Sequence, residues 1–215
     1  MALRLAVLAL ALAASGCVPY TVGGTPRTVA PRIVEPSAVL QIASARRDVD
    51  RDSQARTNRP GLVLGNEARL GLDEASDVGV RLTGLGGVTA TYKRRLSGAP
   101  GGDAGTALVV GAGVIGLSHV HAEATLVAAS RPLGDRVYPY YGVRAQALAP
   151  FAADAVQTDP ALGVFAGGRV GWPDLSLAPE LGVFYSPSPN RGESPWILVP
   201  SVTVRGERLV KALGL

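Results

Sequence analysis

The sequence predicts an all-β protein, an antiparallel up-and-down β-barrel that occupies residues 61–206. Two observations lead to this fold class. Beyond residue 61, short segments in which apolar and polar residues alternate with a period of two follow one another, separated by Gly, Pro, Asp and Asn. Tight turns at 83–86 and 172–174 join neighbouring segments, and many hairpins in one domain favour a sheet that closes on itself.

The number of strands follows from the alternating segments. The alternation is clearest at 77–83, 119–126 and 137–148, where one face is apolar and the other polar. It is weaker at 67–72, 88–96, 162–172, 175–185 and 196–205, and residues 107–117 are apolar on both faces. These segments number about nine, and because bacterial single-chain membrane barrels have an even number of strands, we predict eight or ten.

The pattern leaves open whether the barrel lies in a bilayer or in water. Each segment has about the 9 to 11 residues that a tilted strand needs to cross a bilayer. Aromatic residues stand at segment ends, as in an interfacial girdle: Tyr92, Trp172, Tyr185 and Trp196. Prolines lie inside three predicted strands, where each removes a ladder hydrogen bond: Pro139, Pro179 and Pro200. The chain ends in a short amphipathic tail, residues 207–215, instead of a terminal strand.

Residues 1–16 predict an export signal. Arg4 supplies a positive charge, residues 5–14 form an unbroken Leu, Ala and Val run, and Ser15 and Gly16 are small residues before a cleavage point. The apolar run is about half the roughly 20 residues that a membrane-spanning helix needs. The segment therefore indicates a cleaved signal and not a permanent anchor.

The residues at the cleavage point suggest how the mature chain is anchored. Ala14, Ser15, Gly16 and Cys17 together resemble the lipobox of bacterial lipoproteins. The resemblance implies that Cys17 is acylated and becomes the first mature residue. In that family an Asp after the cysteine favours inner-membrane retention, whereas Val18 follows here, which implies the outer membrane. Whether the lipid anchors the chain on the periplasmic side or at the surface stays open.

Between the signal and the barrel, residues 17–60 carry several prolines and a polar stretch, 46–52, with almost no aromatic residues. This composition is typical of a tether. Ser37 is placed to cap a short helix through Arg47, so we expect a linker with a helical turn or two.

One face of the predicted strands collects the charged residues. If every strand keeps its alternation, this face holds Glu67, Arg69, Asp77, Arg81, Lys93, Arg95, Arg144, Arg169, Glu180 and Arg205. Turned inward, these residues would fill a narrow barrel with paired charges and leave no wide pore.

His119, His121 and Glu123 share that face, about 7 Å from one to the next. They are compatible with a metal site if a neighbouring strand adds a ligand, or with ordinary membership of a polar interior.

A glycine motif at residues 111–116 offers a different interpretation. Gly111, Gly113 and Gly116 follow an apolar run and resemble the dinucleotide fingerprint of flavin-dependent amine and amino-acid oxidases. The resemblance implies a helix over 118–131 and a ribose-binding role for Asp135. The alternative is a strand of small residues that relieve crowding in a curved sheet.

Three functions follow from these features. The first is a lipid-anchored, non-enzymatic envelope protein with no cofactor, whose loops at 97–104, 149–160 and 187–195 contact an envelope protein. The second is a periplasmic lipocalin-like binder, in which the apolar face points inward around a small apolar ligand. The third is a flavin-dependent oxidoreductase. Nucleic acid is excluded as a partner because the net charge is only +4 and the basic residues are scattered.

Overall fold

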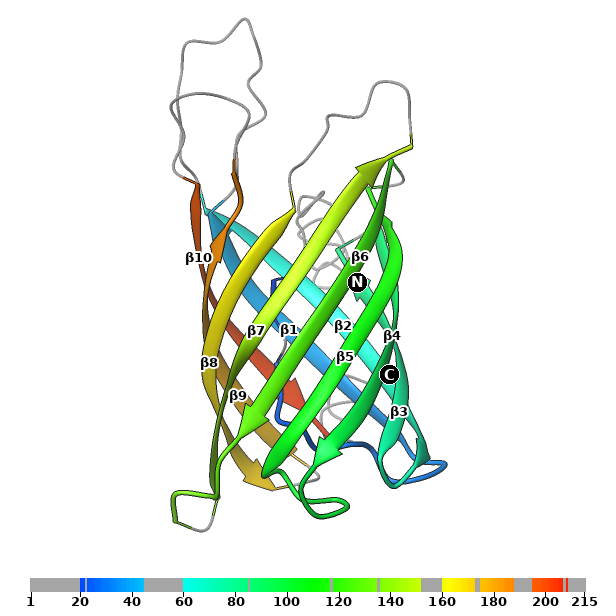
Figure 1. Cartoon of the computed structure of the whole chain (residues 1–215), viewed down its shortest axis with the longest axis vertical. Helices are drawn as coiled ribbons and strands as arrows, with labels where there is room; N and C mark the ends of the chain where they lie inside the picture. The colour runs from blue at the N-terminus through cyan, green and yellow to red at the C-terminus, as the bar shows by residue number, and fades with distance from the viewer. Residues whose placement is uncertain are drawn as a thin grey trace, which may run out of the picture.

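Ten antiparallel strands form a single closed barrel in the computed structural model (Figure 1). The structure describes residues 20–21, 23–44, 60–84, 86–116, 118–134, 136–151, 160–172, 175–187, 195–206 and 208. The strands are β1 (Val34–Ser44), β2 (Pro60–Asp73), β3 (Ser76–Thr83), β4 (Gly87–Ser97), β5 (Gly105–Ile115), β6 (His119–Ala129), β7 (Val137–Pro150), β8 (Ala161–Trp172), β9 (Leu175–Tyr185) and β10 (Trp196–Arg205). Each strand pairs with its sequence neighbour, and β1 pairs with β10 to close the ring.

The strand that the sequence analysis missed is β1. Residues 34–44 fell in the predicted tether, and the helical turn expected there after Ser37 is wrong. Ser37 and Gln41 face the inside of the barrel and are buried, whereas Leu40 and Ile42 are exposed on the outside. The local alternation is weak, but β2 and β10 supply hydrogen-bond partners along both edges of this strand. The barrel therefore begins at Val34 and not at residue 61, and the strand number is ten, one of the two predicted values.

The two faces of the wall differ sharply in chemistry. Side chains that point outward from the strands are mostly large, exposed and apolar, such as Leu64, Val80 and Leu181. Side chains that point inward are mostly polar or charged and buried, such as Glu67, Arg81 and Arg144. The alternation along each strand therefore separates an apolar outer wall from a polar lumen.

The two ends of the barrel also differ. Strands β1, β7 and β9 finish at the same end of the barrel, which we call the long-loop end because the stretches of sequence that follow them, 45–59, 151–160 and 186–195, are the longest between strands (Figure 1). Strands β2 and β8 finish at the opposite, short-turn end, where only two residues separate each of them from the next strand and where β1 begins and β10 finishes. In the described part of the chain, no helix has the length and apolar character that crossing a membrane requires.

The three prolines lie inside strands, as the sequence indicated. Pro139 in β7 is opposite Gly168 in β8, and Pro179 in β9 is opposite Val202 in β10. The β8–β9 ladder loses its regular pairing between Gly167 and Val170, next to Pro179. Because a proline donates no hydrogen bond, the sheet is locally weakened here while the ring stays closed.

Candidate functional site

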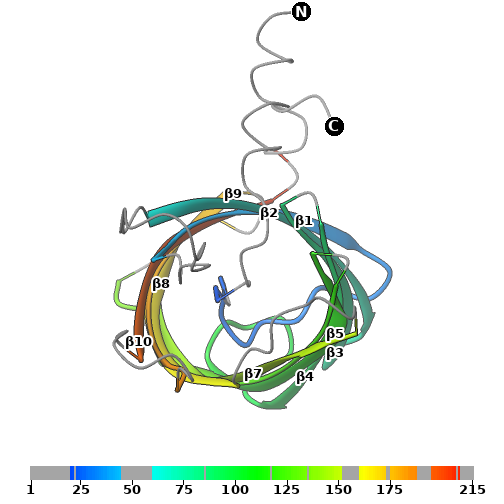
Figure 2. The same cartoon turned by 90° about the horizontal axis from the view of Figure 1, so that it is seen from above.

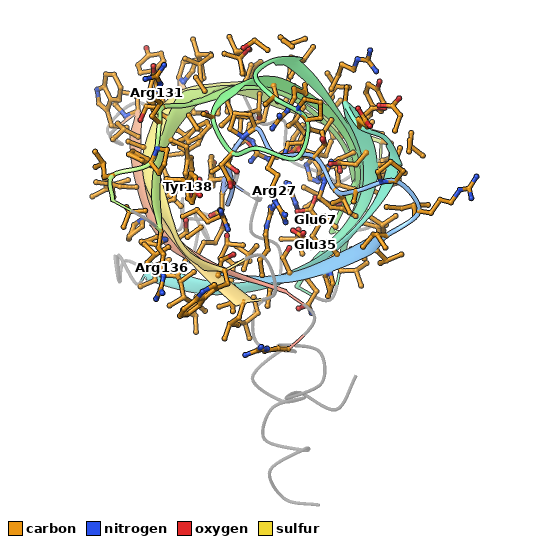
Figure 3. The ribbon with its side chains drawn as sticks, turned by 90° about the horizontal axis from the view of Figure 1, so that it is seen from below. Arg27, Glu35, Glu67, Arg131, Arg136 and Tyr138 are labelled. Carbon is orange, nitrogen blue, oxygen red and sulfur yellow. The ribbon has the colours of Figure 1, made fainter. Side chains whose placement is uncertain are left out.

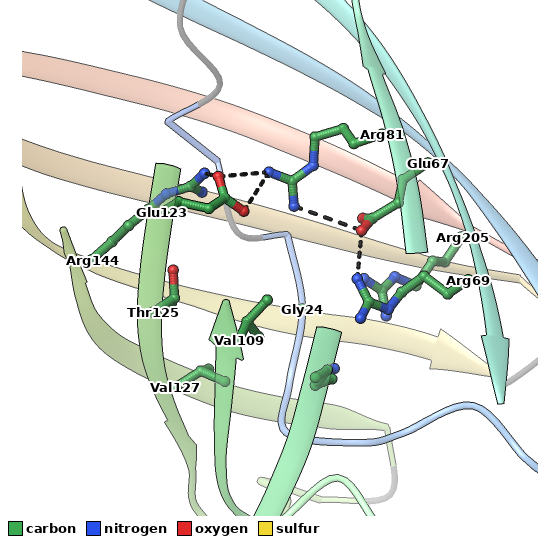
Figure 4. Close-up of a pocket in the computed structure, with 11 residues that line it drawn as sticks. Gly24, Glu67, Arg69, Arg81, Val109, Glu123, Thr125, Val127, Arg144 and Arg205 are labelled. Atoms are coloured by element: carbon green, nitrogen blue, oxygen red, sulfur yellow. Dashed lines mark hydrogen bonds and ion pairs between the residues drawn. The ribbon is translucent and has the colours of Figure 1, made fainter. Parts of the chain in front are cut away.

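A chain of ion pairs crosses the lumen of the barrel (Figure 4). Arg144 from β7 pairs with Glu123 from β6, and Arg81 from β3 contacts the same carboxylate, with 3.3 Å between Nη1 and Oε1. Arg81 also reaches Glu67 on β2, with 3.7 Å between Nη2 and Oε1, and Glu67 accepts a hydrogen bond from Arg69 Nη1 at 2.5 Å. Alternating charges thus join strands from opposite parts of the ring.

Each charge in this chain is buried and compensated. Arg69 continues the chain to Asp77 on β3, where its Nε donates to Oδ1 at 2.7 Å. Moving two charges out of water costs desolvation free energy. An ion pair offsets this cost only when its geometry is close and further hydrogen bonds satisfy its remaining polar atoms. Thr91 helps here, because its hydroxyl accepts a hydrogen bond from Arg69 Nη1 at 3.0 Å.

Two glycines make room for this chain of ion pairs. A Cβ atom on Gly111 of β5 would lie 3.0 Å from both Glu123 Cγ and Thr91 Cγ2. A Cβ atom on Gly79 of β3 would lie 3.0 Å from Arg69 Nη1. Both glycines therefore sit where a larger side chain would displace the charged groups.

The N-terminal part of the described chain runs through the lumen. Residues 20–29, of which 22 is outside the description, form what we call the lumen segment; Figure 2 shows it inside the ring, whereas residues 30–33 are exposed. Near the long-loop end the Tyr20 ring packs on Phe184 of β9, 4.7 Å between centroids. There the Gln41 side chain accepts hydrogen bonds from the backbone N–H groups of Tyr20 and Thr21, both at 3.2 Å.

Charged lumen side chains bind the backbone of this segment along its length. Arg144 Nη1 donates to the carbonyl of Thr21 at 2.8 Å, and Glu180 accepts from the N–H of Gly23 at 2.9 Å. Further along, Lys93 Nζ donates to the carbonyls of Thr25 and Arg27 at 2.9 and 2.7 Å. A buried peptide that does not pair with a strand lacks hydrogen-bond partners for its backbone N–H and C=O groups. These side chains supply those partners.

The segment leaves the lumen at the short-turn end. Asp77 accepts a hydrogen bond from the N–H of Val29 at 2.9 Å, and the Thr28 hydroxyl donates to the Glu74 carbonyl in the β2–β3 turn. Arg27 pairs with Glu35 at the start of β1, and seen from below both point into the ring (Figure 3). The segment thus descends through the lumen and the chain then returns upward as β1.

Two glycines fit the lumen segment to its surroundings. A Cβ atom on Gly23 would lie 2.1 Å from Thr203 Oγ1, and Gly23 has a φ of 66°, which favours glycine. A Cβ atom on Gly24 would lie 2.8 Å from Arg205 Nη2. Beside the central ion pairs a cavity of about 20 Å³ remains, room for about one water molecule.

The connection 98–104 also closes the lumen, at the short-turn end. Asp103 is buried, receives a hydrogen bond from Arg169 Nη2 at 2.5 Å and another from the Thr25 hydroxyl at 2.5 Å. Arg95 donates to the Gly102 carbonyl. Residues 97–104, one of the three predicted contact loops, lie at the opposite end of the barrel from the connections that follow β7 and β9, with residues 97–101 exposed and the Asp103 carboxylate turned inward.

The predicted metal-site residues are placed differently from one another. Glu123 is held by Arg81 and Arg144, and His121 Nε2 lies 3.7 Å from Glu123 Oε2 and Nδ1 lies 3.5 Å from Thr89 Oγ1. His119 is the first residue of β6, and its Nδ1 lies 2.8 Å from the Ser118 hydroxyl oxygen. Among the described residues no three His, Cys, Asp or Glu side chains come together as a metal site. The two arginines on Glu123 favour the alternative, membership of a polar lumen.

The dinucleotide-binding interpretation is wrong. Gly111 and Gly113 lie within strand β5, and Gly116 lies in the tight turn to β6 with a φ of 62°. Residues 119–129 form strand β6, where the fingerprint requires a helix whose N-terminus faces the phosphates. A Cβ atom on Gly113 would lie 2.0 Å from the Val88 carbonyl oxygen, so this glycine allows close approach of β4.

The lipocalin-like interpretation is also wrong, because the faces of the wall are the reverse of what it requires. The predicted charged face points inward: Glu67, Arg69, Asp77, Arg81, Lys93, Arg95, Arg144, Arg169, Glu180 and Arg205 are all buried. A small apolar ligand would find charged groups and the lumen segment in the space it needs. Cys17 and residues 1–16 lie outside the described residues.

Sequence reasoning found the charged lumen but missed the lumen segment. Residues 20–29 have no alternation, and their proline and glycines match the composition of a tether. The adjacent glycines Gly23 and Gly24 were the available signal, since they mark a place where other groups approach the backbone closely. Nothing local identifies those groups, which come from β1, β4, β7, β9 and β10.

Comparisons with known proteins identify similar barrels. No protein-family model matches the chain, and no curated protein matches it. Among solved structures, Neisserial surface protein A is 17% identical with a TM-score of 0.40, over 81% of this chain and 95% of that one. The N-terminal β-barrel domain of Pseudomonas aeruginosa OprF is 10% identical with a TM-score of 0.34, over 82% and 99%. The Yersinia pestis outer membrane protein Ail is 16% identical with a TM-score of 0.33, over 80% and 99%.

Proposed function

We propose that this chain is a lipid-anchored protein of the bacterial outer membrane, an integral β-barrel with a non-enzymatic structural or interaction role in the envelope. The observation that carries the proposal is the apolar outer wall. Outward positions on all ten strands expose large apolar side chains, which a protein surrounded by water would bury. Facing lipid, the same side chains are in their preferred solvent, and the closed ring leaves no strand edge unpaired.

Aromatic residues support a bilayer around this wall. Trp196 and Tyr185 contact each other at the long-loop end, with 5.2 Å between ring centroids, and both are exposed. At the short-turn end the exposed Trp172 ring lies 4.2 Å from the guanidinium of Arg136. Aromatic rings at both ends of an apolar wall are typical of the two membrane interfaces.

The lumen supports a role other than transport or catalysis. Its centre is crossed by paired charges, and the lumen segment occupies much of the remaining space. The connections 45–59, 151–160 and 186–195 follow strands that finish at the long-loop end, and in this proposal they provide the surface that an envelope partner binds. In this proposal the lipid on Cys17 attaches the same chain to the membrane a second time.

The test is a Cys17→Ser variant expressed next to the unchanged protein. We expect the unchanged protein to incorporate a labelled fatty acid and to fractionate with outer membranes. It should also migrate differently on denaturing gels before and after boiling, because a detergent-resistant barrel unfolds only on heating. Cys17→Ser should lose the label. A variant that still takes up label contradicts lipidation, and an unchanged protein that is soluble without detergent contradicts the membrane barrel.

A further inference from the structure

A groove of about 480 Å³ lies on the outer wall, over strands β6 to β9 and near the long-loop end. Two directly opposed alanine pairs line it, Ala122 with Ala147 and Ala124 with Ala145. The next pair along the same two strands is Leu126 with Val143, both exposed. The outer wall is therefore hollowed where alanines stand in place of larger side chains, within a mostly apolar surface.

The lumen segment brings the N-terminal part of the chain to this region of the barrel. Tyr20 packs inside the wall on Phe184, the residue before Tyr185. Phe184 points into the lumen, whereas Tyr185 points outward and lines the groove together with Leu162 and Pro187. Tyr20 and the groove thus lie on opposite sides of the barrel wall, at the end of β9.

The remaining length of chain limits where Cys17 can lie. Cys17 precedes Tyr20 by three residues, and three residues span at most about 10 Å when extended. The other end of the lumen segment leaves the barrel at the short-turn end, where Val29 and Thr28 are held. We therefore infer that the mature N-terminus lies at the long-loop end, the opposite end of the barrel from the start of β1.

We propose that the groove binds an acyl chain carried by Cys17. The proposal rests on the lipidation and the membrane barrel proposed above. A hydrocarbon chain has the narrow, apolar shape that alanine pairs between larger side chains accept. The short connection from Tyr20 holds this acyl chain at a high local concentration beside the groove, an advantage that a free membrane lipid lacks. The lipid thus inserts in the leaflet at the long-loop end.

The experiment supplies cells with a fatty acid that carries a photoreactive diazirine, irradiates intact membranes and maps the modified residues by mass spectrometry. Both the lipid on Cys17 and the membrane phospholipids incorporate this fatty acid. In the unchanged protein we expect modification to concentrate at the groove alanines. In Cys17→Ser the concentration at the groove should disappear, while modification by phospholipids elsewhere on the wall persists. Equal groove modification in both proteins would assign the groove to membrane lipid and overturn the proposal.

Two further variants change the groove or the wall elsewhere and keep Cys17, so they test the groove without removing the lipid. Ala147→Leu fills the groove, and Ala90→Leu enlarges an outward alanine on β4 that does not line it. We expect Ala147→Leu to reduce groove modification at least several-fold and Ala90→Leu to leave it unchanged, with the N-terminal peptide of both still acylated. An N-terminal peptide without lipid would instead refute the lipidation itself. Cross-linked dimers through the groove would show that a second copy binds there and overturn the proposal.

Discussion

At the scale of single residues, Glu123 lies near one end of the chain of ion pairs and pairs with two arginines from different strands. Its carboxylate contacts Arg144 and Arg81 and lies near His121, and all four side chains are buried. A buried carboxylate shared by two guanidiniums cannot be removed without leaving positive charge uncompensated, and the resulting cost exceeds the net value of the intact pairs. The sequence singled out Glu123 only as a candidate metal ligand beside His119 and His121, and not as a partner of Arg81 and Arg144.

Glu123→Gln should therefore lower the free energy of unfolding by about 3 to 5 kcal/mol, because it removes the carboxylate that pairs with buried Arg144 and leaves buried Arg81 with Glu67 alone. Urea titration of the barrel in detergent or lipid vesicles measures this change. The control is Asp73→Asn, which removes an exposed ion pair with Arg94 whose Oδ2 to Nη1 distance is 3.5 Å, and should change stability little. Equal effects of the two substitutions would show that the lumen charges are well solvated.

At the scale of elements, the lumen segment is held by contacts with lumen side chains and not by a sheet ladder. Gln41, Arg144, Glu180, Lys93 and Asp77 each bind its backbone. Because these hydrogen bonds involve only the backbone of the segment, they can form with many different side chains at its positions. The steric limit comes from Gly23 and Gly24, where the wall approaches the backbone most closely.

Gly23→Val should expel the lumen segment, since its Cβ atom would overlap Thr203. The reporter is Thr21→Cys in a Cys17→Ser background, because Thr21 is buried in the lumen and a cysteine there reacts with maleimide only when the segment leaves. Gly101→Val is the matched control: Gly101 has a φ of 70°, close to the 66° of Gly23, but has no atom within 4 Å of its Cβ position. In this background we expect Gly23→Val to make the cysteine at position 21 react rapidly with maleimide, and Gly101→Val to leave the reaction slow. Slow labelling in both would contradict a steric requirement for Gly23.

At the scale of the whole molecule, the outer wall decides the environment of the barrel. Its apolar positions continue around the ring, and the outward charge of Arg94 stands near the end of β4. A bilayer penalises an outward charge according to depth, most at the midplane and little near the interface. A barrel in water would show no such dependence on depth.

Leu181→Arg places a charge on the outside near the middle of β9 and should cost about 2 to 4 kcal/mol of stability in vesicles. Leu96→Arg, also outward but next to the end of β4, should cost about 0 to 1 kcal/mol. Urea titration of folding into vesicles compares the two. Similar costs at both positions would contradict a membrane-spanning wall.

The closed barrel and the division of its residues into two faces were predictable from sequence. Both depend on alternation with a period of two, which is local and is visible in strands such as β3 and β6. The ten charged residues grouped by that alternation do share the buried face. The even strand number corrected a count of nine, because closing the ring leaves no place for an odd strand in this class of barrel.

Tertiary structure alone decided which face lies inside, where the ring closes and what fills it. Strand β1 is specified by the edges of β2 and β10, and the lumen segment by side chains from strands far along the chain. The sequence left two interpretations of Gly111 and Gly113 open, and the positions of Glu123 and Val88 decide for a strand whose small residues relieve crowding. Contacts between distant residues leave no periodic signal in either partner, so no local pattern could have predicted them.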